Sequence, residues 1–135
     1  DGDAEAADGI PAAVQALADQ IAAADAVVIS TPEYNKAPSG VLKNALDWVS
    51  RTKGSPFAGK PVAVMSAAGG RAGGEQAQAL LRSFLVPFQP RVIAGPGVHL
   101  ANSSNEFDDA GQLTSGHYTD TLTTLMQNLR QEISG

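Results

Sequence analysis

The chain has 135 residues, of which 43% are hydrophobic, a size and composition typical of one globular domain. Its formal charge of −5 provides no basic face for nucleic acid, and no apolar run reaches the length that spans a membrane. Because cysteine is absent, disulfides, thiolate catalysis and cysteine-ligated metal sites are excluded, and this fits a cytoplasmic protein.

The first third of the chain predicts a helix followed by a strand. Residues 1–9 are small and acidic, so we expect a loop or a frayed start there. A helix is predicted over residues 10–24, where apolar residues recur at helical spacing: Ile10, Val14, Leu17 and Ile21. Residues 26–31 then open with an apolar run whose composition is typical of a strand buried on both faces.

Two further helices flank a second strand. Ser39 is suited to the N-cap of the next helix. Its inward stripe is predicted to be Val41, Leu42, Ala45, Leu46 and Val49. Residues 52–60 form a loop, residues 61–66 a buried strand, and residues 67–74 a glycine-rich run. The helix over about residues 75–86 is predicted to face inward with Ala77, Leu80, Leu81, Phe84 and Leu85.

The last third completes an alternating pattern. A short strand is predicted at residues 92–94, continuing irregularly to 98–100, and a polar loop at residues 101–116. The final helix is defined by Leu122, Leu125, Met126, Leu129 and Ile133. Because strands alternate with helices, we predict an α/β fold with a parallel sheet and helices on both faces.

Three loops follow the three predicted strands, at Thr31–Lys36, Ser66–Gly74 and Gly95–Asn102. Right-handed crossovers place all three at the same end of the sheet. In open α/β sheets, ligands bind in the crevice at the carboxyl ends of the strands. The sequence therefore predicts a ligand site formed by these loops, where glycine allows the backbone to approach a flat ligand closely.

Residues 31–51 carry the most specific pattern: Thr-Pro-Glu-Tyr-Asn, a Pro-rich turn, then Ser-Gly-Val-Leu-Lys-Asn-Ala-Leu-Asp-Trp. This segment closely resembles the flavin-contacting loop of the NAD(P)H-dependent FMN reductase family, which includes quinone, azo-dye and chromate reductases. The resemblance implies a flavodoxin-like α/β/α sandwich that binds FMN. It also implies hydride transfer from NADPH or NADH to the flavin, and from there electron transfer to a small-molecule acceptor.

The same resemblance assigns Pro32, Glu33, Tyr34 and Asn35 to flavin binding. The alternative interpretation of these residues is a simple turn with Asn35 bonded to its own backbone. No catalytic residue is assigned, because the flavin carries the chemistry in this family. No metal site is assigned either, since the two histidines are far apart in the sequence and no acidic cluster accompanies them.

In the glycine-rich run, Ser66, Gly69, Gly70 and Arg71 are the further flavin-binding candidates. The run matches neither a Walker A loop nor a dinucleotide fingerprint, so a flexible connection is its alternative interpretation. Arg71 is expected to reach a flavin edge or a pyridine-nucleotide phosphate, or else to be a solvated residue at a helix start. His99 is interpreted as structural rather than as a ligand contact.

The resemblance covers the C-terminal three-quarters of the family fold. Nothing in the chain corresponds to the family's first strand or to the loop that grips the FMN phosphate. We therefore expect residues 1–135 to be one flavodoxin-like domain that is truncated at its N-terminus, or one whose missing strand comes from another copy. An opening at Asp1 instead of Met fits a partial chain.

Relatives often form dimers, so a homodimer or homotetramer is expected, with contacts through the helix from Ser39 to Ser50 and the loop after it. Two other functions stay open at this point. One is a flavodoxin-type electron carrier that does not oxidise NAD(P)H itself. The other is a flavin-free α/β interaction module or an inactive fragment.

Overall fold

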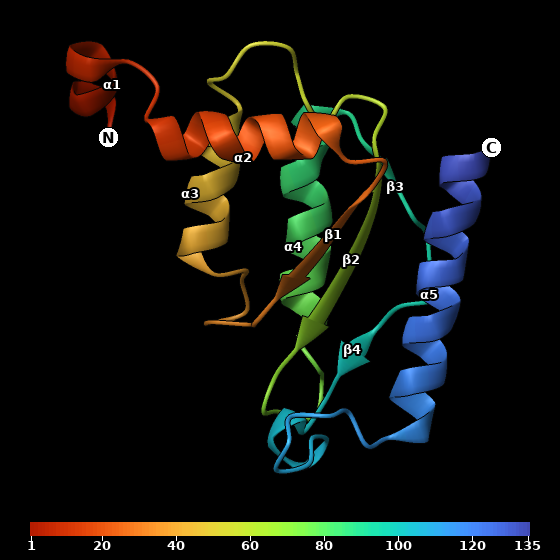
Figure 1. The fold of residues 1–135 in the computed structure, drawn as a ribbon. Coiled ribbons are helices and arrows are strands. Elements are labelled where there is room, and N and C mark those ends of the chain that lie inside the picture. The colour runs from red at the N-terminus through yellow and green to blue at the C-terminus, as the bar shows by residue number, and fades with distance from the viewer.

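The computed structural model describes all of residues 1–135 and places helices on both sides of a short sheet (Figure 1). The helices are α1 (Gly2–Asp8), α2 (Ala12–Ala23), α3 (Gly40–Val49), α4 (Glu75–Leu85) and α5 (Gly116–Ser134), with 3-10 turns η1 (Val86–Phe88) and η2 (Ser103–Asn105). The strands are β1 (Val27–Thr31), β2 (Pro61–Ala67), β3 (Arg91–Val92) and β4 (His99–Leu100). None of the helices combines the length and apolarity needed to cross a membrane.

The sheet is parallel throughout with β2 in the middle, which confirms the predicted α/β class. β1 pairs with one edge of β2 along its whole length and forms an edge of the sheet. On its other side, β2 pairs with β3 at its start and with β4 near its carboxyl end. Residues 93–98 connect β3 to β4 without regular structure, so the two act as one interrupted strand. The predicted third strand is thus confirmed in outline.

Local sequence explains where several helices begin. The Ser39 hydroxyl accepts a hydrogen bond from the Leu42 N–H at 3.2 Å, so the predicted N-cap of α3 is confirmed. The expectation of a loop over residues 1–9 is wrong. There, the Asp1 carboxylate accepts a hydrogen bond from the Asp3 N–H at 3.0 Å and caps the start of α1.

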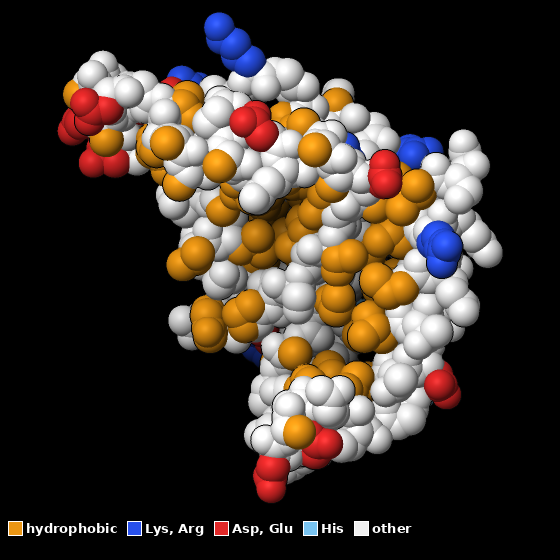
Figure 2. Space-filling view, in the orientation of Figure 1, with side chains coloured by type: hydrophobic (Ala, Val, Ile, Leu, Met, Phe, Trp, Pro, Cys, Tyr) orange, Lys and Arg blue, Asp and Glu red, His pale blue; other side chains and the backbone are white.

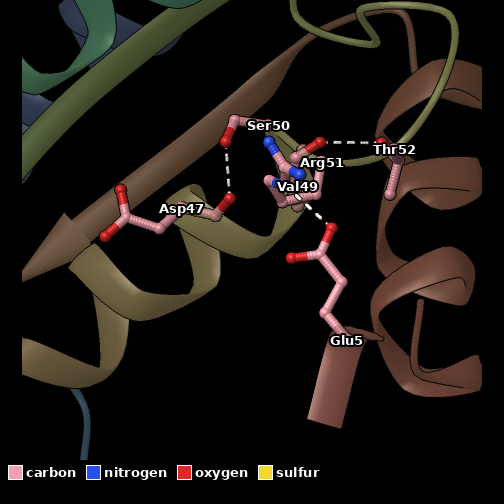
Figure 3. A network of polar contacts seen from close by, with 6 residues as sticks. All are labelled: Glu5, Asp47, Val49, Ser50, Arg51 and Thr52. Atoms are coloured by element: carbon pink, nitrogen blue, oxygen red, sulfur yellow. Dashed lines mark hydrogen bonds and ion pairs between the residues drawn. The ribbon is translucent and has the colours of Figure 1, made fainter. Parts of the chain in front are cut away.

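The end of α3 is joined to α1 by an ion pair (Figure 3). Arg51 Nε lies 2.9 Å from Glu5 Oε1. Beside this pair, the hydroxyls of Ser50 and Thr52 donate hydrogen bonds to backbone carbonyls of the last turn of α3. These bonds satisfy acceptors that have no partner inside the helix. α1 therefore docks on the α3 side of the molecule.

The face of the sheet toward α2, α3 and α4 carries the larger core. Its nine buried residues are Ile21, Ile29, Leu46, Val49, Phe57, Val62, Val64, Leu81 and Leu85. Leu81 and Leu85 are both 0% exposed where α4 packs on β2. Phe57 contacts Phe88 edge-on, with ring centres 5.6 Å apart, and closes one end of this core.

The opposite face is covered by α5 alone. Its buried cluster has five residues: Ala63, Ile93, Val98, Leu125 and Leu129. Figure 2 shows apolar side chains gathered in a hollow over the sheet, between α2 and α5. Val28 of β1 points to this face and is 43% exposed. The prediction that this strand is buried on both faces is therefore wrong, because α5 packs against β2 and leaves β1 partly uncovered.

The predicted inward stripes are confirmed at most helical positions. The exceptions, exposed by 37% or more, are Leu17, Val41, Leu80 and Ile133. Val41 and Ile133 belong to the terminal turns of α3 and α5, and Leu80 lies at the margin of the α4 stripe. An apolar stripe at helical spacing is broader than the strip that contacts the sheet, so its margins face solvent.

Candidate functional site

β1, β2 and β4 all terminate at the same end of the sheet, so their carboxyl ends lie side by side. Thr31 lies opposite Ser66 in the register, and Ser66 lies opposite His99 on its other side. In Figure 1 the arrowheads of these strands point to the same end of the molecule. The prediction that the three loops begin at a common edge is therefore confirmed.

The loop after β1 is a tight two-residue turn. Tyr34 and Ala37 exchange two backbone hydrogen bonds with N···O distances of 2.9 and 3.0 Å. Between them, Asn35 and Lys36 have φ values of 49° and 68°, the left-handed pair of a type I′ turn. The turn exists as the alternative interpretation supposed, but the Asn35 side chain makes no hydrogen bond to its own backbone. Instead, the turn presents Asn35 and a 63% exposed Tyr34 to solvent.

Pro32 and Glu33 differ in their surroundings. Pro32 is exposed, and its carbonyl accepts a hydrogen bond from the buried Thr31 hydroxyl at 2.8 Å, which fixes the exit from β1. The Glu33 side chain is only 12% exposed, and its carboxylate accepts a hydrogen bond from the Ala77 N–H at 3.0 Å. Of the four residues that the resemblance assigns in this loop, Glu33 alone is turned toward the protein.

The Ser66 side chain belongs to the interior beneath the loops. It is 2% exposed, and its hydroxyl donates to the Gly73 carbonyl at 2.6 Å. It also accepts from the Gln78 amide at 3.0 Å, and that amide donates to the Val98 carbonyl at 2.8 Å. Gln78, itself 2% exposed, escaped the sequence analysis because a polar residue among apolar helix positions does not reveal which loops it joins.

The glycines of the second loop fall into two pairs. Gly73 has a φ of 62°, and a Cβ atom there would lie 2.3 Å from the His99 carbonyl oxygen. Gly74 has a φ of 83°, and a Cβ atom there would lie 2.8 Å from Ser66 Cβ. These two glycines are required by backbone conformation and close packing. Gly69 and Gly70 are the two glycines predicted from the sequence to bind flavin. Both are exposed, and a Cβ atom added to either would have no heavy atom within 4 Å. They leave the surface of the loop open.

The third loop is fastened to the second loop and to α5. The Asn102 N–H donates to the Gly70 carbonyl at 3.1 Å, and the Ala101 N–H donates to the Tyr118 hydroxyl at 3.0 Å. His99 is half-buried and lies against Gly97. Arg71 is exposed, and its guanidinium makes no hydrogen bond or ion pair within the chain.

The chemistry of this edge fits a flat ligand with a polar rim. The backbone N–H groups of Asn35, Gly69 and Gly70 have no acceptor in the protein, and all three residues are exposed. Such donors are suited to ring oxygens and nitrogens, and the side-chain-free surface of Gly69 and Gly70 permits close approach. The residues present therefore fit the isoalloxazine portion of FMN. Elsewhere on α4, burial lowers the pKa of Arg82.

Comparison with known proteins agrees with this geometry. The family model of the NADPH-dependent FMN reductases matches residues 1–105. The chain is 41% identical over 122 residues to an NAD(P)H-dependent FMN reductase of Pseudomonas aeruginosa, covering 90% of this chain and 66% of the relative. It is 42% identical over 128 residues to the quinone reductase of Escherichia coli, covering 91% and 68%.

Among solved structures, the flavoenzyme NAD(P)H:(acceptor) oxidoreductase of Paracoccus denitrificans is similar, with a TM-score of 0.77 and 31% identity. That alignment covers 98% of this chain and 71% of the other. The fold is therefore flavodoxin-like, and the chain spans about two-thirds of the length of these relatives. The family name itself identifies FMN as the implied cofactor and a pyridine nucleotide as the implied electron donor. This chain belongs to the NADPH-dependent FMN reductase family.

Proposed function

We propose that the protein is an FMN-dependent oxidoreductase that takes a hydride from NAD(P)H and reduces a second, small-molecule acceptor. The observation that carries the proposal is that the loops after β1 and β2 begin at the same end of the sheet. There the exposed turn with Tyr34 and Asn35 and the open glycines Gly69 and Gly70 follow neighbouring strands. Family membership supports the same reaction.

FMN, when bound, would supply the redox chemistry, namely hydride uptake from NAD(P)H and electron release to the acceptor. The chain binds and orients the ring. Pro32, Tyr34 and Asn35 would contact the ring, and the free N–H groups of Gly69 and Gly70 would donate hydrogen bonds to its polar atoms. Arg71 is exposed beside these glycines, where its charge suits an anionic part of the flavin or the pyridine nucleotide.

Flavin binding is the first property to test, by titrating the chain with FMN and following the quenching of flavin fluorescence. Wild-type protein is expected to give saturable quenching. Tyr34→Ala is expected to raise the Kd about fivefold, because an exposed aromatic side chain that stacks on a ring contributes roughly this much to affinity.

Val86→Ala is the matched control for this titration. Val86 is 70% exposed like Tyr34, but it lies in η1, beyond the C-terminal end of α4 and away from the loops. It is expected to leave the Kd unchanged. Equal losses in both variants, or no quenching in the wild type, would contradict the proposed site.

The acceptor is proposed as a class: a flavin, a quinone, an azo dye or a metal oxyanion. The relatives include a protein named quinone reductase and one named FMN reductase, so both kinds of acceptor belong in the assay. Steady-state oxidation of NADPH separates a reductase from a flavodoxin-type carrier, since a carrier binds FMN and gives no turnover with NADPH.

We also propose association into a homodimer or homotetramer through α3. Val41 at the start of this helix is 82% exposed, so its side chain is accessible to another copy of the chain. Sedimentation velocity over a range of protein concentrations checks this proposal. A single monomeric species at every concentration would contradict it.

A further inference from the structure

The start of α4 lacks a capping side chain of its own. Its N-cap residue is Gly74, which makes no side-chain hydrogen bond. The first N–H groups of a helix have no partner inside it and require one from elsewhere. Here the Ala77 N–H donates to Glu33 Oε2 at 3.0 Å, so a residue 44 positions earlier in the chain provides the cap.

The carboxylate of Glu33 suits this position electrostatically. A negative charge at a helix N-terminus is stabilised by the aligned peptide dipoles. Burial strengthens the interaction, since the Glu33 side chain is only 12% exposed. Lys36 contributes less, because its Nζ is 3.9 Å from Glu33 Oε1 and its side chain is 67% exposed.

The next residue of α4 contacts the other two loops. Gln78 donates from its amide to the Ser66 hydroxyl and to the Val98 carbonyl, at 3.0 and 2.8 Å. Ala77 and Gln78 therefore connect the first turn of α4 to segments after β1, at the end of β2 and before β4. Of these connections, only the bond from Ala77 to Glu33 joins α4 to the turn that carries Tyr34 and Asn35.

We propose that Glu33 is a positioning residue, which sets the separation between the Thr31–Ala37 loop and the glycine-rich loop through its hydrogen bond to the Ala77 N–H. This role deepens the proposed function and depends on it, because both loops would bind the same flavin. Glu33 acts through Ala77 and through the turn, and the neighbouring Tyr34 and Asn35 make the contacts with the ligand.

Two substitutions at Glu33 separate the effect of side-chain length from the effect of side-chain charge. Glu33→Gln removes the charge but keeps an oxygen at the same distance, so it is expected to preserve the hydrogen bond. Glu33→Asp keeps the charge but shortens the side chain by one methylene, so it is expected to lose the bond. Glu33→Asp is therefore expected to raise the Kd for FMN about tenfold, and Glu33→Gln about threefold or less.

Glu75→Gln is the matched control. Glu75 is an exposed carboxylate in the first turn of the same helix, and no hydrogen bond or ion pair joins it to another loop. The substitution removes a charge from the α4 N-terminus without breaking a connection between loops. It is expected to leave both the Kd and the loops unchanged.

Amide hydrogen exchange of the protein without FMN supplies the second measurement. Glu33→Asp is expected to speed exchange in both Thr31–Ala37 and Gly73–Gln78, whereas Glu33→Gln and Glu75→Gln leave these segments protected. Absence of FMN binding by the wild type would overturn the proposed function, whereas coupled loss of protection in the two segments would still show that Glu33 joins the two loops.

Two results would overturn the positioning role. One is unchanged exchange in Gly73–Gln78 in the Glu33→Asp variant. The other is a Glu33→Gln variant that is more impaired than Glu33→Asp in both measurements, since that order would mean that Glu33 acts through its charge and not through its reach.

Discussion

The two faces of the sheet are covered very differently, although both are lined by apolar strand residues. Toward α2, α3 and α4, nine residues form a continuous buried cluster. Toward α5, the cluster has five residues, and Val28 remains 43% exposed. β2 is buried on both faces, whereas β1 is buried on one. Burial of a strand is thus decided by the elements packed on it and not by its apolar composition alone.

The candidate site depends mainly on the better-covered face. α3 and α4 both start at the carboxyl edge of the sheet, and both pack on that side. The start of α3 is capped by Ser39, and the first turn of α4 holds the loop after β1 through the Ala77 N–H. A densely packed core limits small displacements of these helix starts. The contrast between the faces therefore predicts where substitutions disturb the molecule most.

The largest effect is expected from Leu81→Ala, in the nine-residue cluster. Leu81 is 0% exposed and packs between α4 and the sheet. The substitution is expected to lower the free energy of unfolding by about 3–4 kcal/mol, because it leaves a cavity that a tightly packed core does not fill. Urea denaturation measures this loss.

Leu80→Ala is the control for that experiment, since Leu80 is the neighbouring leucine on the same helix and is 40% exposed. Its expected cost is about 0.5 kcal/mol, as for most surface positions. If the two variants lose equal stability, α4 does not pack on the sheet in the described orientation.

The second effect, of intermediate size, is expected on the α5 face. Leu125 is also 0% exposed, but it belongs to the five-residue cluster beside the partly uncovered β1. Leu125→Ala is expected to cost about 2 kcal/mol, near the lower end for buried leucines, because we expect the smaller cluster to relax around the lost atoms more readily. A loss in urea denaturation greater than that of Leu81→Ala would reverse the order of the two faces.

Features determined by neighbouring residues could be predicted from the sequence, whereas features that join distant residues could not. The Ser39 cap and the turn at Tyr34–Ala37 depend on neighbouring residues, and both are accessible from local patterns. The bond between Glu33 and Ala77 joins residues 44 positions apart, so no local pattern could reveal that Glu33 faces inward. Its assignment to flavin contact depends on its place in the motif alone.

The glycine-rich loop shows the same limit in another form. Gly70 and Gly73 are equivalent in sequence, but a side chain at Gly73 would collide with the backbone of His99 and one at Gly70 would meet nothing. That difference arises only when β4 is placed beside β2. The exposure of Val28 likewise depends on where α5 packs, which apolar composition does not encode.

The smallest effect is expected from Val28→Thr, on the open face of β1. Threonine keeps the shape and the strand preference of valine, and the added hydroxyl can reach solvent at a position that is 43% exposed. The expected change in the free energy of unfolding is within about 0.5 kcal/mol.

Val64→Thr makes the same chemical change on the other face, at a residue of β2 that is 1% exposed. There the hydroxyl lies among apolar side chains, and the expected cost is about 1–2 kcal/mol. Urea denaturation of both variants at several protein concentrations measures the contrast. If Val28→Thr were as costly as Val64→Thr, and more so at high concentration, another copy of the chain would be covering β1. The two faces of the sheet would then be unequally covered only in a single copy of the chain, and equally covered in the protein as it associates in solution.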